Sequence, residues 1–168
     1  MSRRIPPVWL ALLSVILAYG FLGVLVVRLL GLGDTFPAPV ALARVSGALF
    51  VVLGMWLLGW AIHHLSLRRA FGREIYAPPS DSTLVTTGPF AYVRNPLYLG
   101  AAIALVGWTL FLRSTILVVV TPLMLVHFAL VARWEARELS SRLGPRYEAY
   151  RRATPSFIPR RPPRTGRS

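Results

Sequence analysis

Four long apolar runs, each almost free of charge, constrain this chain more than any other feature of its sequence. They cover residues 8–27, 40–62, 97–112 and 115–132. A helix of twenty residues rises about 30 Å, which matches the hydrocarbon thickness of a bilayer. Inside that layer every backbone N–H and C=O must be paired within the protein, and a helix achieves this alone. The runs therefore predict an all-α, polytopic membrane bundle of about four transmembrane helices.

Glycine, proline and arginine mark the boundaries of these runs. Pro6-Pro7 suits the start of the first helix, because an early proline loses no helix hydrogen bond. Arg113-Ser114 is the only break between the third and fourth runs, which predicts a tight helical hairpin. Pro122 is expected to kink the fourth helix and to free a backbone carbonyl near its middle.

The sequence becomes amphipathic and basic from Arg133 onward. Gly144-Pro145 is expected to end one helix and to begin another. Four large residues nevertheless recur at helical spacing and are expected to share one helical face: Leu139, Leu143, Tyr147 and Tyr150. The segment predicts a C-terminal amphipathic helix on the cytoplasmic surface.

The 168 residues are expected to form a single membrane domain. Within it, residues 1–64 form a two-helix anchor and residues 82–159 form the functional core. Residues 160–168, which are rich in arginine and proline, are expected to be disordered.

The arginines give the expected topology. Two precede the first run, four lie between the second and third, and ten follow the fourth, whereas only Arg28, Arg44 and Arg113 fall at the opposite ends. This bias places both termini in the cytoplasm. The net charge of +13 also favours contact with anionic lipids. It does not indicate nucleic acid, because the arginines gather at the ends of apolar runs. Small size and arginine richness favour a bacterial inner membrane.

Several kinds of site are excluded or disfavoured by residue type. The chain has no cysteine, so it has no disulfide and no thiolate nucleophile. His63 and His64 are adjacent and point in different directions on a helix, so they predict interfacial residues and no metal site. His127 lies within the fourth run, where it is either a polar residue of the core or part of a cavity that receives a substrate.

Residues 84–100 combine two glycines, two prolines, three aromatic residues and Arg94 at the mouth of the third run. An arginine at a membrane boundary is costly, so it usually has a partner or a function. Glu135 follows the fourth run at the same end, and the tight hairpin makes these two ends neighbours. An acidic residue among arginines indicates either a salt bridge or contact with a cationic ligand.

Two blocks of sequence carry a family resemblance. Residues 84–90 (LVTTGPF) and 93–100 (VRNPLYLG) resemble the patterns LVTxGxY and RHPxYxG of the superfamily of isoprenylcysteine carboxyl methyltransferases and phospholipid methyltransferases. Residues 135–150 (EARELSSRLGPRYEAY), with 155–159 (PSFIP), resemble its second block, EExxLxxxFGxxYxxY. The two blocks occur in the family order and are separated by a helical hairpin.

The resemblance implies S-adenosylmethionine as methyl donor, bound on the cytoplasmic side. Arg94 and Glu135 would be the catalytic residues, and Glu135 would also hold the cationic amino-acid end of the cofactor. Arg133 and His127 are the candidate substrate residues. The implied cofactor-binding residues are Ser82, Thr83, Leu84, Val85, Phe90, Asn95, Pro96, Leu97, Tyr98 and Glu135.

Three positions depart from the family pattern. Asn95 replaces the commoner histidine, Phe90 replaces tyrosine, and Ala136 replaces the second glutamate. The substrate-contacting arginine of the isoprenylcysteine enzymes falls at Val131, and Arg133 lies on a different helical face. The resemblance therefore supports the cofactor site better than it supports an isoprenylcysteine substrate.

Methyl transfer from a sulfonium is an in-line displacement, so such an enzyme mainly supplies positioning and desolvation. The expected acceptor is lipophilic or small and membrane-soluble, carries a carboxyl, amine or thiol, and enters from the bilayer. One alternative is an NADPH-dependent membrane reductase of the sterol-reductase type, which has a similar RHPNY block. Leu97 after Pro96, and the lack of an acidic residue after Gly100, favour the methyltransferase. The other alternative is a non-enzymatic membrane scaffold.

Overall fold

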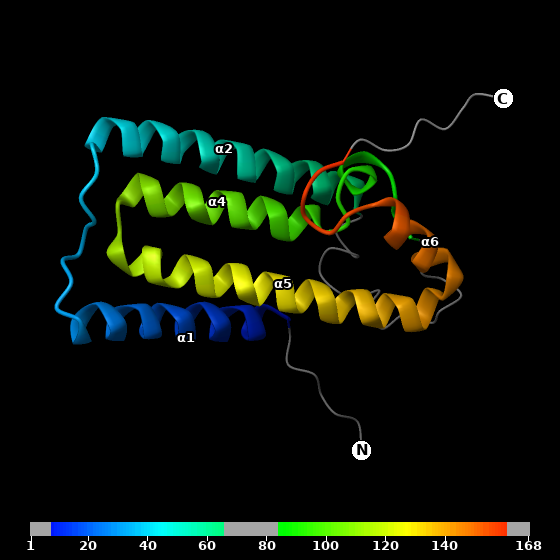
Figure 1. The fold of residues 1–168 in the computed structure, drawn as a ribbon, viewed down its shortest axis with the longest axis horizontal. Coiled ribbons are helices and arrows are strands. Elements are labelled where there is room, and N and C mark those ends of the chain that lie inside the picture. The colour runs from blue at the N-terminus through cyan, green and yellow to red at the C-terminus, as the bar shows by residue number, and fades with distance from the viewer. Residues whose placement is uncertain (1–7, 66–83, 161–168) are drawn as a thin grey trace, which may run out of the picture.

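The computed structural model describes residues 8–65 and 84–160, and of residues 8–17 only the backbone (Figure 1). These ranges contain helices and loops, a single isolated β-bridge between Thr35 and Ser114, and no strand, which confirms the all-helical class. The helices are α1 (Val8–Leu29), α2 (Val40–His64), α4 (Pro96–Leu112), α5 (Thr115–Leu143) and α6 (Pro145–Ala153), with a short 3₁₀ helix, η2 (Gly88–Ala91). Ser82, Thr83 and residues 161–168 of the predicted tail lie outside the described residues.

The four long helices run antiparallel to their neighbours and lie side by side in the order α2, α4, α5, α1 (Figure 1). The α2–α4 contact is the most extensive in the bundle. We call the end that carries η2, the start of α4, the end of α5 and α6 the site end. The other end, formed by residues 30–39 and the turn at 113–115, is called the turn end.

Four glycines form a seam between α2 and α4, and they allow the two backbones to approach closely. Gly47 and Gly54 lie on α2, and Gly100 and Gly107 lie on α4, seven residues apart in each case. A Cβ built on Gly54 would lie 2.5 Å from the backbone nitrogen of Ala104, and one on Gly47 would lie 2.5 Å from that of Phe111. Larger side chains would therefore force the helices apart.

The other helix pairs, α4 with α5 and α5 with α1, are joined by contacts between polar side chains. Thr109 of α4 and Thr121 of α5 join their hydroxyl oxygens at 2.7 Å, and both residues are buried. On the far side of α5, the Tyr19 hydroxyl of α1 lies 3.4 Å from Nδ1 of His127. Buried hydroxyls that bond to each other remove the penalty of leaving polar groups unpaired in apolar surroundings.

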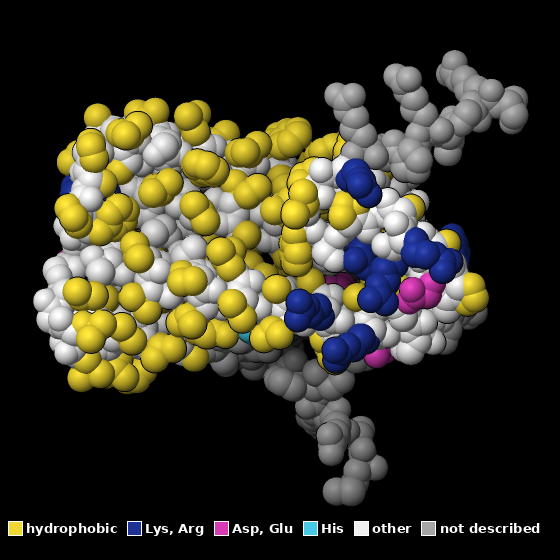
Figure 2. All heavy atoms as spheres, viewed as in Figure 1, with side chains coloured by type: hydrophobic (Ala, Val, Ile, Leu, Met, Phe, Trp, Pro, Cys, Tyr) yellow, Lys and Arg dark blue, Asp and Glu magenta, His cyan; other side chains and the backbone are white. Residues whose placement is uncertain are grey.

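The outer surface of the bundle is apolar, as Figure 2 shows along the length of the helices. Exposed fractions reach 75% for Leu29, 71% for Phe21 and 68% for Val52. Helices α2 and α5 are long and apolar enough to cross a membrane, and only 17% of each apolar window is buried inside the protein. A soluble protein does not expose apolar surface on this scale, so the bundle is that of an integral membrane protein. Helix α4 is shorter, at 17 residues.

Helix α5 extends well beyond the fourth apolar run. It is continuous across Pro122 and continues to Leu143, where Gly144 with φ +54° ends it and Pro145 begins α6. The predicted helix boundary at Gly144-Pro145 is confirmed. The expectation of one shared face for four large residues is wrong, because the break at Gly144 places Tyr147 and Tyr150 on a different helix from Leu139 and Leu143.

Candidate functional site

The loop before α4 depends on Gly88. This residue has φ +60°, a conformation that glycine adopts readily and other residues do not. It also lies against the His64 ring, which would collide with any side chain at that position. The His64 Nδ1 bonds to the carbonyl of Trp60 at 3.0 Å, which fixes the ring. The glycine therefore lets η2 pack tightly onto the end of α2.

Residues 154–160, which we call the strap, pair with the loop through the backbone. The N–H of Arg94 donates to Pro155 O at 2.8 Å, the N–H of Asn95 to Ser156 O at 3.2 Å, and the N–H of Arg160 to Tyr92 O at 3.3 Å. The two sequence blocks therefore meet at the site end, which agrees with the expectation that both lie on the same side of the membrane.

Tyr150 of α6 adds a side-chain tie between the two blocks. Its hydroxyl donates to Phe90 O at 2.7 Å. Burial raises the pKa of the Tyr150 hydroxyl, with the nearby Tyr147 as a smaller cause, so the group remains a protonated donor at neutral pH. Neither Tyr150 nor Ser156 was assigned a role from sequence, although both lie in the second family block.

Arg94 turns toward the strap and not toward Glu135. Its Nη2 donates to the Ser156 hydroxyl at 2.6 Å, while its Nε is buried without a hydrogen-bond partner. The side-chain amide of Asn95 donates to Ser156 O at 3.3 Å. Arg94 and Asn95 therefore belong to a polar cluster around Ser156.

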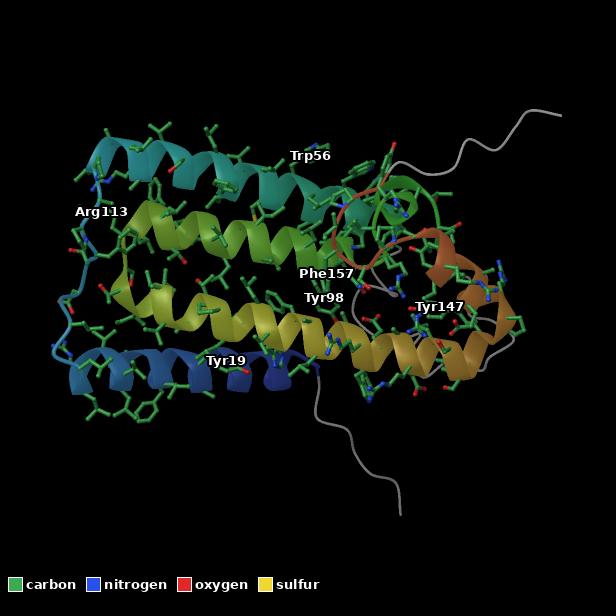
Figure 3. All side chains as sticks on the ribbon, viewed as in Figure 1. Tyr19, Trp56, Tyr98, Arg113, Tyr147 and Phe157 are labelled. Carbon is green, nitrogen blue, oxygen red and sulfur yellow. The ribbon has the colours of Figure 1, made fainter. Side chains whose placement is uncertain are left out.

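Tyr98 and Glu135 form the contact that joins the two helices of the hairpin at the site end. The Tyr98 hydroxyl donates to Oε2 of Glu135 at 3.3 Å, and its ring packs on Phe128 with centroids 5.9 Å apart. Figure 3 shows Tyr98 between α4 and α5. Composition favoured a salt bridge for Glu135, but the contact found for its carboxylate is the hydrogen bond from Tyr98.

The environment of Glu135 favours a cation. The side chain is half-buried between helices, where a charge is screened less than in water. A tyrosine hydroxyl orients the carboxylate but does not neutralise it. A cationic group bound here would therefore gain electrostatic energy from Glu135.

The remaining predicted site residues divide into two groups. Phe90 and Pro96 are buried and Leu84, Val85 and Leu97 are half-buried, all at the site end. His127 and Arg133 are not brought to Glu135. His127 faces α1 and contacts Tyr19, and Arg133 is exposed and lines a separate cleft.

Comparison with known proteins gives the family. The sequence model of the phospholipid methyltransferase family matches residues 42–146. The chain is 37% identical over 112 residues to protein-S-isoprenylcysteine O-methyltransferase of Schizosaccharomyces pombe, covering 66% of this chain and 47% of that protein. It is also 37% identical over 84 residues to the cobalt-zinc-cadmium resistance protein CzcN of Cupriavidus metallidurans, covering 48% of this chain and 37% of that protein.

A third relative is the nickel-cobalt-cadmium resistance protein NccN of Alcaligenes xylosoxydans xylosoxydans, 37% identical over 88 residues, or 51% of this chain and 41% of that protein. The chain spans less than half of the length of each of these relatives. No solved structure matches it significantly. Because the family model covers more than half of the sequence, including most of α2 and all of α4 and α5, the chain belongs to the phospholipid methyltransferase family, within the superfamily that includes the isoprenylcysteine methyltransferases.

Proposed function

We propose that the chain is an integral membrane methyltransferase that uses S-adenosylmethionine. The acceptor is a lipophilic or small membrane-soluble molecule with a carboxyl, amine or thiol group. Family membership supports methyl transfer. The observation that carries the proposal is the Tyr98–Glu135 contact, because it joins residues from both family blocks across the hairpin.

The residues at the site end fit this cofactor. S-adenosylmethionine carries an ammonium and a sulfonium, and Glu135 is a half-buried carboxylate that accepts a hydrogen bond from the neutral Tyr98 hydroxyl. Leu84, Val85 and Leu97 would supply apolar contacts, as would Phe90 and Pro96. The Asn95 amide and the Tyr98 hydroxyl would supply hydrogen bonds. When bound, the cofactor supplies a methyl group on a positively charged sulfur.

The protein contributes position and exclusion of water. Glu135 would orient the cationic end of the cofactor, and Tyr98 would hold the Glu135 carboxylate in one rotamer. Arg94, first expected to be catalytic, is better proposed as a positioning residue that fixes the strap through Ser156. A carboxylate acceptor needs no base. An amine or thiol acceptor must lose a proton, and Glu135 is the candidate base for that step.

The site end would face the cytoplasm, with four membrane-spanning helices and both termini on that side. The arginine distribution supports this orientation, because the described arginines of α5, α6 and the strap all lie at the site end. The acceptor would then enter laterally from the bilayer, as the exposed apolar surface of the helices permits. A bacterial inner membrane remains the expected location.

The test is isothermal titration of the full-length, detergent-purified chain with S-adenosylmethionine and with NADPH. We expect S-adenosylmethionine to bind with a dissociation constant on the order of 10 µM. Glu135→Ala should weaken binding about tenfold or more, because it removes a charged contact, and Tyr98→Phe should weaken it less. Glu138→Ala removes a carboxylate three residues further along α5 and is the matched control.

The alternatives give different results in the same titration. Binding of NADPH instead of S-adenosylmethionine would assign the chain to the reductases. Binding of neither compound would favour a membrane scaffold. A supporting measurement is transfer of a labelled methyl group from S-adenosylmethionine into membrane lipids or prenylated acceptors, lost in Glu135→Ala.

A further inference from the structure

A cleft of about 510 Å³ opens beside the candidate site, between α5, α6 and the strap. Four arginines line it: Arg94, Arg133, Arg137 and Arg151. The rest of its wall includes Ser156, Phe157 and three alanines of α5, and Figure 2 shows arginine atoms gathered at this end of the molecule. The alanines at positions 129, 132 and 136 leave room above the helix, so the cavity results from small side chains flanked by long cationic ones.

The cleft carries an excess of positive charge. Its lining residues include no carboxylate. Glu148 approaches one of the four arginines, with its Oε1 3.5 Å from Nη1 of Arg151. Glu135 lies on a neighbouring face of α5, where it accepts a hydrogen bond from the Tyr98 hydroxyl, and it does not line the cleft. The remaining arginines repel one another across a partly enclosed space, and a bound anion would relieve that repulsion.

Arg94 brings a fourth guanidinium to the cleft from the loop before α4. Its side chain lines the cleft, one of its terminal nitrogens is used by Ser156, and its buried Nε has no partner in the described structure. This Nε has almost no accessible surface, so an anion in the cleft would be held by the charge of the Arg94 guanidinium together with the other three arginines.

Phosphate is the anion that best fits such a set of donors. Guanidinium groups bind phosphate oxygens in pairs of parallel hydrogen bonds, and several can do so at once. Arg133 and Arg137 are one turn apart, so they reach the same region. The exposed Trp134 and Ile158 adjoin the cleft in sequence, and apolar side chains beside arginines are typical of the headgroup layer of a membrane.

We propose that this arginine cleft is a phosphate-binding site, filled either by the headgroup of an anionic phospholipid or by free phosphate. It differs from the substrate arginine expected in the isoprenylcysteine enzymes, which would fall at Val131 on another face of α5. The proposal does not depend on methyl transfer, because the site is tested by binding alone.

Two probes distinguish the sources of the phosphate. Inorganic phosphate is titrated into the full-length, detergent-purified chain by calorimetry. Separately, native mass spectrometry counts phosphatidylglycerol and phosphatidylcholine bound to the chain. We expect the double variant Arg133→Gln/Arg137→Gln to lose about tenfold or more of the affinity for whichever phosphate probe binds. The matched control, Arg146→Gln/Arg152→Gln, removes two exposed arginines of α6 that do not line the cleft, and should change affinity less than about twofold.

A footprint on the unmodified protein gives a readout that does not depend on folding of a variant. An arginine-reactive dicarbonyl is applied with and without each probe, and modified residues are located by mass spectrometry. Protection of Arg133 and Arg137, but not of Arg146, supports the proposal. Protection by inorganic phosphate identifies free phosphate as sufficient, and protection by phosphatidylglycerol alone identifies the lipid headgroup.

Three results would overturn the proposal. One is that neither probe binds or protects. Another is an equal loss of affinity in both double variants, which would mean diffuse attraction to net positive charge. The third is equal binding of phosphatidylglycerol and phosphatidylcholine together with no binding of inorganic phosphate, because that pattern would reflect lipid tails.

Discussion

Arg94 and Arg113 lie at opposite ends of α4 and make closely related contacts. Each guanidinium reaches a segment far away in sequence, with Nη2 of Arg94 on the Ser156 hydroxyl and Nη2 of Arg113 on Phe36 O at 3.2 Å. Each is accompanied by backbone pairing, and each has a buried Nε without a partner in the described structure. Figure 3 shows Arg113 at the turn end, beside the loop that it holds.

The difference lies in what surrounds the two arginines. At the turn end, Arg113 closes a tight turn in the left-handed conformation, with φ 52°, and the bridge between Thr35 and Ser114 lies next to it. At the site end, Arg94 borders a cleft and lies one turn before Tyr98. Both arginines hold a loop by the same kind of contact, and only Arg94 also borders the cleft and the candidate site.

The largest expected effect is a loss of stability that disturbs both ends of the bundle at once. Gly54→Leu should place a side chain against the backbone of α4, the helix that joins the two arginines, and this backbone cannot move aside. We expect a loss of about 3 kcal/mol or more in the free energy of unfolding. Thermal unfolding in detergent measures it. Gly59→Leu is the control, because nothing lies within 4 Å of Gly59; equal destabilisation by both substitutions would contradict the seam.

The next effect separates the two ends. Arg94→Ala should weaken S-adenosylmethionine binding about tenfold, because the strap loses its tie, whereas Arg113→Ala should leave that affinity within about twofold. Arg113→Ala should lower stability by about 1 kcal/mol through loss of the bond to Phe36 O.

Arg113→Gly sharpens this test of the turn end. The left-handed conformation is unfavourable for any residue with a Cβ by about 1–2 kcal/mol, so the glycine variant should be more stable than the alanine variant. Titration calorimetry measures the cofactor affinity of the three variants, and thermal unfolding measures their stability. Equal loss of cofactor affinity in Arg94→Ala and Arg113→Ala would show that the ends are not distinct.

The smallest expected effect concerns the corner between α5 and α6, which holds the strap at the site end. The Ser140 hydroxyl donates to Oε1 of Glu148 at 2.6 Å, and this bond, helped by Arg151 and Arg152, lowers the pKa of the Glu148 carboxyl below its usual 4.5. A lowered folded-state pKa stabilises the protein above the usual value, and this contribution is lost as pH falls through the lowered pKa.

Ser140→Ala should therefore be slightly less stable than the unmodified chain at neutral pH, and the difference should shrink as the medium is acidified to about pH 3. Thermal unfolding across that range measures it. Ser141→Ala is the control, because the Ser141 hydroxyl bonds to Glu138 O and does not reach Glu148. A difference that stays constant with pH would contradict the role of the carboxylate.

Much of the fold could be predicted from the sequence, because the bilayer sets the length of an apolar run. The second run, 40–62, became helix Val40–His64, and the third, 97–112, became Pro96–Leu112. The end of α5 at Gly144 was also predicted. The apolar run ends at Ala132, but a helix continues in water until something breaks it, and Gly144 is the first breaker.

The site was predicted in part, because the sequence shows which residues lie at the same end but not which way their side chains point. The sequence indicated that Tyr98 and Glu135 lie at one end, since a short hairpin leaves no other arrangement. It could not show that Arg94 turns to Ser156, because residues 62 positions apart give no local pattern. For His127 the sequence left two possibilities, a polar residue of the core or part of a cavity, and the fold shows that it contacts Tyr19 of α1.

The strap also has a consequence for how the protein is made. Ser156 is synthesised 62 residues after Arg94, which takes roughly 3–12 s at ribosomal rates of about 5–20 residues per second. During that interval the glycine seam of α2 and α4 can form. The loop before α4 lacks its backbone partners until the strap has been synthesised. Insertion into the membrane and completion of the site are therefore separate events in time. We expect a nascent chain halted before residue 154 to be anchored in the membrane but to lack the strap, and therefore the proposed cofactor site.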